Sequence, residues 1–237
     1  MEIERRVEEY ARGRGDLAQL FALLLEPHRA LPRGDARTPP LEEIRQAYQD
    51  RLRFLHSCRA IRDGSATSCR PLAALGRGPD QWCDGHLLLY RTLLRPMLVE
   101  RRCDVAAIRR AARPAEEPPP GVLGFCEAVS QRRADGCAPL PGHLRGLCLA
   151  LVYDDVARCA ETGPRPARGG AWIDGDCRHF FQAAKALAAG DPKQLAPDAD
   201  ASAYVGAMLG TTGACEDRFL QTMRALLRGT RGPALRD

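Results

Sequence analysis

Residues 126–159 read CEAVSQRRADGCAPLPGHLRGLCLALVYDDVARC, with cysteines every eleven residues at Cys126, Cys137, Cys148 and Cys159. An α-helix rises about 1.5 Å per residue, so cysteines eleven apart on one helix lie roughly 16 Å apart. A disulfide needs Cα atoms within about 7 Å. Cys148 and Cys159 share a helix predicted over 142–160, so they cannot pair with each other. Eleven residues return a helix to nearly the same face, and both thiols therefore point at the same neighbour.

That neighbour is the preceding helix, predicted near 121–134 and joined to 142–160 by a short connection. In an antiparallel hairpin, the residue numbers of two directly opposed residues always add up to the same value. This rule pairs Cys126 with Cys159 and Cys137 with Cys148. We expect two disulfides here, and the inner one closes a loop worth about 3 kcal/mol in the chain-entropy description.

The arrangement resembles the coiled-helix–coiled-helix proteins of the mitochondrial intermembrane space, whose helix pairs carry twin C-x9-C motifs joined in the same way. This chain departs from them, because its spacing is C-x10-C and Cys137 follows Gly136 instead of lying inside a helix. The similarity covers about forty residues. We interpret it as shared geometry and not as shared ancestry.

Six further cysteines are disulfide candidates. If helices 41–63 and 82–100 also form an antiparallel hairpin, the same rule places Cys58 opposite Cys83 and predicts a disulfide between them. The others have no register in the sequence; they are Cys69, Cys103, Cys177 and Cys215. The alternative for several of the six is a small buried hydrophobe, since free cysteine is among the most buried residue types.

The apolar residues recur at helical spacing nearly throughout, which predicts an all-α protein of about nine helices, a multi-helix bundle or stacked antiparallel hairpins stapled by disulfides. Asp16 begins a helix with Gln19 three residues later, in a capping-box arrangement, and Pro27 closes it. The most apolar segment, from Trp82 to about Arg101, is expected to be the central helix and to kink at Pro96. Further helices are predicted near 174–189, 200–209 and 214–228.

Residues 113–121, rich in proline, form the clearest linker. They divide the chain into an N-terminal helical half, 1–112, and a C-terminal helical half, 122–237, unless the two form one continuous domain. At 237 residues the chain is long enough for either arrangement.

The net charge of +5 does not indicate a nucleic-acid protein. Only Lys185 and Lys193 are lysines, and the arginines are interleaved with acids. With abundant Ala, Gly and Pro, this bias is typical of the codon usage of a high-GC bacterium. A dense basic face with stacking aromatics, which single-strand binding needs, is missing from a chain that is 5 % aromatic.

Ten cysteines, an even number, favour an oxidising compartment. The sequence contains no run of eighteen apolar residues, so it predicts no transmembrane helix. The first residues lack the apolar core of a signal peptide, so we expect Met1 to be an expression start on a trimmed mature domain. The alternative is a cytoplasmic protein whose thiols are reduced or bind zinc or copper.

The only histidine that shares a helix face with a nearby cysteine is His86, three residues after Cys83, which makes this pair a weak metal candidate. Asp154 and Asp155 are similar to the acidic motif of helical prenyl-chain enzymes, but Arg158 stands where that motif needs a third acid. We expect Arg158 to pair with Asp154 instead. His143 is the remaining candidate for a small helical enzyme.

Arg-Gly-Asp occurs at 14–16 and 33–35, in predicted loops, and a tripeptide of this composition also arises readily by chance. Motifs for nucleotides, zinc proteases and serine hydrolases are absent from the sequence. The sequence therefore predicts a non-catalytic binding or assembly module of the cell envelope, periplasmic or secreted, without a cofactor. Its partner is expected to be a protein recognised through helix faces.

Overall fold

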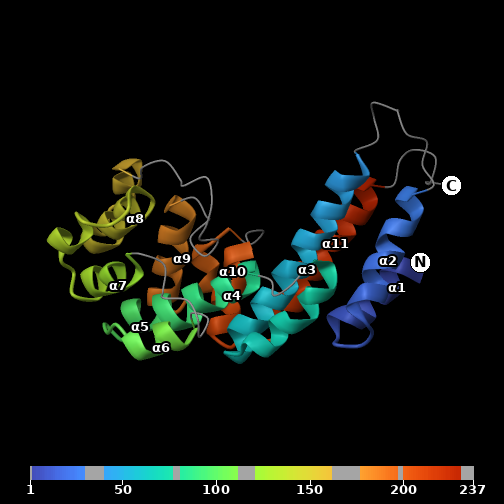
Figure 1. The fold of residues 1–237 in the computed structure, drawn as a ribbon, viewed down its shortest axis with the longest axis horizontal. Helices are drawn as coiled ribbons and strands as arrows, with labels where there is room; N and C mark the ends of the chain where they lie inside the picture. Colours follow the sequence, from blue (N-terminus) through green and yellow to red (C-terminus); the bar gives the residue numbers. More distant parts are fainter. Residues whose placement is uncertain are drawn as a thin grey trace.

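The computed structural model describes residues 2–29, 40–76, 81–111, 121–161, 177–196 and 200–230. Within these ranges the chain is helical and contains no strand, which confirms the predicted all-α, disulfide-stapled fold. The molecule is elongated, with α1 and α2 at one end and α7 and α8 at the other (Figure 1). In the same ranges, no helix combines the length and apolarity needed to cross a bilayer.

The N-terminal hairpin consists of α1 (Glu2–Ala11) and α2 (Leu17–Arg29). The predicted cap of α2 is confirmed, because the backbone N–H of Gln19 donates to Asp16 Oδ1 at 2.9 Å. The predicted end at Pro27 is wrong, since α2 continues to Arg29. Proline removes one helical hydrogen bond, and a last turn whose apolar side packs inward tolerates that loss.

The central rod is α3 (Leu41–Asp63), whose bounds match the predicted helix. Gly64 ends it in the left-handed conformation, at φ 65°, where its N–H bonds Ala60 O. A 3-10 segment, η1 (Ala66–Leu75), then folds back onto α3. From the far end of the chain, α11 (Ala214–Thr230) packs along α3 (Figure 1).

The predicted central helix exists as three joined segments: α4 (Gln81–Leu87), a π-helical segment η2 (Leu88–Leu94) and α5 (Arg95–Leu98). The π turn immediately precedes Pro96, where the Arg95 N–H bonds the carbonyl of Tyr90. Such widened turns are a common way for a helix to change direction.

The next part contains α6 (Val105–Ala111), α7 (Val122–Ser130), η3 (Ala134–Cys137) and α8 (Gly142–Tyr153). The prediction of one helix over 142–160 is wrong. Asp154 adopts the left-handed conformation, at φ 56°, and the 3-10 segment η4 (Val156–Glu161) follows and packs back on α8. Aspartate tolerates this conformation better than most residues, and Asp155 Oδ1 accepts the N–H of Ala157 to hold the corner.

The chain continues with α9 (Cys177–Ala189), a short 3-10 turn η6 (Pro192–Gln194) and α10 (Asp200–Met208) before α11. The buried side chains form one core, built mainly from leucine and alanine with a few aromatics. The largest fully buried side chains include Tyr48 and Phe54 of α3, Tyr90 of η2 and Phe219 of α11.

All ten cysteines lie in the described ranges and all are paired. The five disulfides are Cys58–Cys215, Cys69–Cys83, Cys103–Cys126, Cys137–Cys148 and Cys159–Cys177. Along the chain, the second cysteine joins the third, the fourth the fifth, the sixth the seventh and the eighth the ninth. The first cysteine joins the last, so the other four bridges are nested within the loop that Cys58–Cys215 closes.

Of the predicted pairings, Cys137–Cys148 is confirmed, with 5.7 Å between the Cα atoms. Cys126–Cys159 is wrong, because the corner at Asp154 breaks the helix on which the register depended. Cys159 instead lies on η4, which contacts α9.

Cys58–Cys83 is also wrong: α3 and α4 do contact one another, but η1 packs on both of them and supplies another cysteine. Cys69 of η1 takes Cys83, and Cys58 faces α11.

Elements from the two predicted halves pack against one another. Both α10 and α11 contact α3, and α5 contacts α7. Residues 113–120 of the predicted linker lie outside the described residues, as do residues 33–35 of the second Arg-Gly-Asp. The division of the chain at that linker stays a prediction.

Candidate functional site

In the folded protein, Cys83 and His86 do not form the predicted metal-binding pair. The sulfur of Cys83 is bonded to Cys69, so it cannot ligate an ion as a thiolate. His86 Nδ1 lies 2.8 Å from the carbonyl of Trp82, and its ring stacks on the Trp82 indole. Among the residues that the structure describes, no group of three or more His, Cys, Asp or Glu side chains converges on a metal-sized space.

The predicted enzymatic residues are not brought together. His143 lies in the first turn of α8 and Asp154 caps its end, which separates them by roughly 16 Å along the helix axis. Asp154 binds Lys185 of α9 at 2.6 Å, both side chains being largely exposed. The expected Arg158–Asp154 pair is wrong; Arg158 contacts Glu161 at 2.8 Å and Asp155 at 3.8 Å, because the corner turns Asp154 away.

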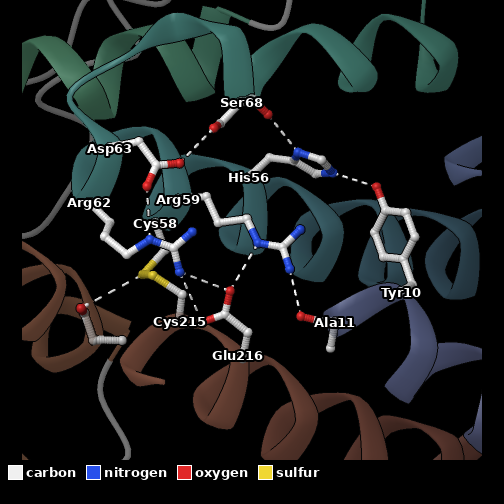
Figure 2. Close-up of polar contacts among 11 residues, drawn as sticks. Tyr10, Ala11, His56, Cys58, Arg59, Arg62, Asp63, Ser68, Cys215 and Glu216 are labelled. Atoms are coloured by element: carbon white, nitrogen blue, oxygen red, sulfur yellow. Dashed lines mark hydrogen bonds and ion pairs between the residues drawn. A yellow bond between two sulfur atoms is a disulfide. The ribbon is translucent and has the colours of Figure 1, made fainter. Parts of the chain in front are cut away.

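The polar side chains that do converge lie on the buried side of α3 (Figure 2). His56 is 4 % exposed, and its Nδ1 lies 2.6 Å from the carbonyl of Ser68. A carbonyl only accepts, so Nδ1 carries the hydrogen and Nε2 of the neutral ring is an acceptor. The Tyr10 hydroxyl, 2.6 Å from Nε2, therefore donates to it. Burial raises the pKa of Tyr10 to about 12, which keeps this donor protonated.

A second part of the same network joins α3 to α11. Arg59 donates to Glu216 Oε1 at 3.0 Å and to the carbonyl of Ala11 at 2.6 Å, and Arg62 donates to Glu216 at 3.1 Å. Burial alone would raise the pKa of Glu216, but the hydrogen bond and charge of Arg59, with the charge of Arg62, bring it below its ordinary value. We call Tyr10, His56, Ser68, Arg59, Arg62 and Glu216 the α3 polar network.

Every contact of the α3 polar network described above is internal, and the Cys58–Cys215 disulfide lies beside it (Figure 2). Its geometry ties α1, η1 and α11 to α3. These contacts give the network a structural role, since each joins α3 to another element. No local pattern in the sequence predicts this network, because Tyr10 and His56 are 46 residues apart.

A pocket of about 240 Å³ lies between α1 and α2, and Tyr10 is one of its lining residues. Its lining includes the first Arg-Gly-Asp, at 14–16, whose aspartate is engaged as the cap of α2. The lining residues are Glu2, Arg6, Glu9, Tyr10, Arg14, Gly15, Asp16, Gln19, Leu20 and Leu23. The periodicity of α1 and α2 predicted their apolar stripes, but the pocket depends on how the two helices diverge.

Several large apolar side chains that do not line this pocket are exposed on helices or in the turns that follow them. They are Leu41, Trp82, Val99, Tyr153, Val156 and Leu209. Trp82 is 43 % exposed and begins a column of rings that runs through His86 to Tyr90 and Tyr204. Tryptophan and tyrosine are enriched at the energetic centres of protein interfaces.

The chain matches no known family model, none of the curated proteins and none of the solved structures with which it was compared. The observed bridges also depart from the pairing that the twin C-x9-C resemblance implies, since Cys126 and Cys159 each join a cysteine outside the 126–159 segment. Fold and site together define an all-α, disulfide-rich helical protein.

Proposed function

We propose that this protein is a non-catalytic, extracytoplasmic binding or assembly module of the cell envelope that recognises a protein partner through its helix faces. The single observation that carries the proposal is the pairing of all ten cysteines in five disulfides. Disulfides of this density persist in a periplasm or outside the cell and are rare in a reducing cytoplasm.

The way in which the polar groups are used supports the same proposal. The α3 polar network and the Asp154–Lys185 pair hold helices together, and the exposed aromatic and aliphatic side chains lie on rigid, cross-linked elements. Rigid aromatic and apolar groups lose little conformational freedom on binding, which favours recognition of a partner.

Intact mass with and without reduction and alkylation tests the compartment. Purified from the periplasm or culture medium, the native protein should take up no alkyl group before reduction and ten afterwards. Alkylation before reduction, or zinc or copper retained after native purification, would support the alternative of a cytoplasmic metal- or redox-handling thiol protein.

Affinity capture tests the binding role. The oxidised protein, immobilised and exposed to envelope fractions under mild cross-linking, should retain a defined protein partner, and the same protein after reduction should not. A screen in which oxidised and reduced protein retain the same material, or none, would contradict the proposal.

A further inference from the structure

The pocket between α1 and α2 has an apolar floor and a charged rim. Tyr10, Leu20 and Leu23 form the floor; Tyr10 and Leu20 are buried, whereas Leu23 is only partly covered. At about 240 Å³, the pocket is suited to a single side chain rather than to a drug-sized molecule, since sites for whole small ligands are typically about 300–1,000 Å³.

The pocket is held in place before anything binds. The Tyr10 hydroxyl is hydrogen-bonded to His56, and the N-terminus of α2 is fixed by the Asp16 cap. The turn between the helices is tied by the Arg14 N–H to the carbonyl of Glu9 at 2.9 Å, and Gly15 supplies a φ of 104° that other residues rarely adopt. A preformed pocket reduces the ordering cost of binding.

The charges of the rim favour a cation. Three carboxylates line the pocket, from Glu2, Glu9 and Asp16, against the guanidinium groups of Arg6 and Arg14. Three carboxylates against two guanidinium groups leave the lining with one surplus negative charge, in a chain whose net charge is +5. Charge complementarity therefore points to a basic side chain of the partner at the rim of this pocket.

The ion pairs within α1 do not prevent such an exchange. Arg5 and Arg6 reach Glu2 and Glu9 at i+3 and i+4 spacing, and the side chains of Glu2, Arg5 and Arg6 are more than half exposed. Exposed pairs of this kind contribute little, so a cation of the partner can replace one arginine at small cost.

We propose that this pocket binds one apolar side chain of a partner polypeptide, flanked by a lysine or arginine that pairs with the carboxylates of Glu2, Glu9 and Asp16. The inference rests on the proposed function, because it names the site and the partner chemistry of a protein-binding module. The apolar side chain packs on Tyr10, Leu20 and Leu23, and the basic side chain lies across the rim.

The probe is a displayed library of random twelve-residue peptides, selected on the oxidised full chain. Selected peptides should place an aromatic or large aliphatic residue within two positions of a lysine or arginine. Leu23→Asp, which puts a charge on the partly exposed floor, should weaken their binding roughly tenfold or more, as loss of a central contact does. Leu209→Asp, at an exposed leucine in the turn directly after α10, is the matched control and should leave binding unchanged.

The variant Asp16→Asn distinguishes a loss of peptide binding from a loss of folding. Asparagine caps a helix as well as aspartate does, so the variant keeps α2 and removes only the charge. It should weaken the same peptides several-fold, with a smaller dependence on salt than the wild type shows. Far-ultraviolet circular dichroism and non-reducing mass confirm the fold of each variant.

Acidic selected peptides, peptides that bind Leu23→Asp as well as wild type, or a library with no enriched peptide would each overturn the proposal. The general binding role is judged separately, by capture of the partner from envelope fractions. A partner captured equally by wild type and Leu23→Asp would leave the module in place and refute this pocket as its site.

Discussion

The Tyr10 hydroxyl donates to Nε2 of His56 across 2.6 Å, so a residue of α1 closes a hydrogen-bond chain that runs through α3 to the carbonyl of Ser68 in η1. The same tyrosine is one of the residues that line the α1–α2 pocket. The pocket and the buried network therefore share one residue, and four predictions follow from this and related contacts.

Replacing Tyr10 with phenylalanine removes the donor to Nε2 in a buried site. We expect a loss of about 1–3 kcal/mol in the free energy of unfolding, the usual cost of depriving a buried acceptor of its partner. Urea denaturation followed by circular dichroism measures it. The control is Tyr153→Phe at a tyrosine that is 54 % exposed, where we expect no measurable change. Equal losses in both variants would refute the role given to the hydroxyl.

The change in the free energy of unfolding at acidic pH should depend on Glu216. Its pKa is lower in the folded protein than the ordinary value of 4.5, so folding is favoured while the carboxylate is charged. This contribution is fully present above pH 4.5 and is lost as the pH falls through the lower, folded-state pKa.

The variant Glu216→Gln should therefore be less stable than wild type near neutral pH, by about 1 kcal/mol for a partly exposed pair. The two proteins should converge in stability as the pH falls below 4.5 and through the lower, folded-state pKa of Glu216. Thermal unfolding between pH 3 and pH 7 measures the difference, and Glu127→Gln, at an exposed glutamate of α7, is the charge-matched control. A gap between wild type and Glu216→Gln that persists unchanged at pH 3 would contradict the prediction.

The disulfides should differ in their contribution according to the loop that each closes. Cys58–Cys215 spans 157 residues and Cys137–Cys148 spans 11. Chain entropy predicts about 4–5 kcal/mol for the first, allowing for the bridges nested inside it, and about 3 kcal/mol for the second. Double alanine variants of each pair, unfolded in urea under non-reducing conditions, measure the order. Both pairs are buried, so a reversed order would show that chain entropy does not dominate.

The corner after α8 should prefer glycine at position 154. Asp154 has a φ of 56°, where a side chain costs roughly 1–2 kcal/mol and a β-branched one more. Asp154→Gly should be neutral or slightly stabilising, and Asp154→Val should lose at least about 1 kcal/mol.

The control for the corner is Lys185→Gln, which removes the exposed Asp154–Lys185 pair without touching the backbone and should cost under about 0.5 kcal/mol. Urea unfolding measures all three variants. If Lys185→Gln were as damaging as Asp154→Val, the ion pair and not the left-handed turn would hold the corner.

The helices were predictable because their signals are local. The bounds of α3 follow from an apolar stripe between Pro40 and Gly64, and the start of α2 follows from the Asp16 cap. The end of α8 was missed because Asp154 and Asp155 read as two more helical residues; the left-handed turn at Asp154 is visible only in the backbone. Because of that turn, Cys159 does not lie opposite Cys126, and the predicted disulfide between them does not form.

The candidate sites also fall into those with a local signal in the sequence and those without one. Cysteine number and spacing indicated a cross-linked protein, and the short hairpin rule found Cys137–Cys148. The α3 polar network escaped notice, since Tyr10, His56 and Glu216 are far apart in the sequence and ordinary in composition.

By itself, the sequence determined an all-α chain with paired cysteines, because helical periodicity, caps and thiol content act over a few residues or through composition. Only the tertiary structure decided which cysteine meets which, that Tyr10 reaches His56, and that α1 and α2 leave a pocket between them. These depend on how rods pack across separations of up to 157 residues, where side-chain shape and one left-handed turn outweigh any local pattern.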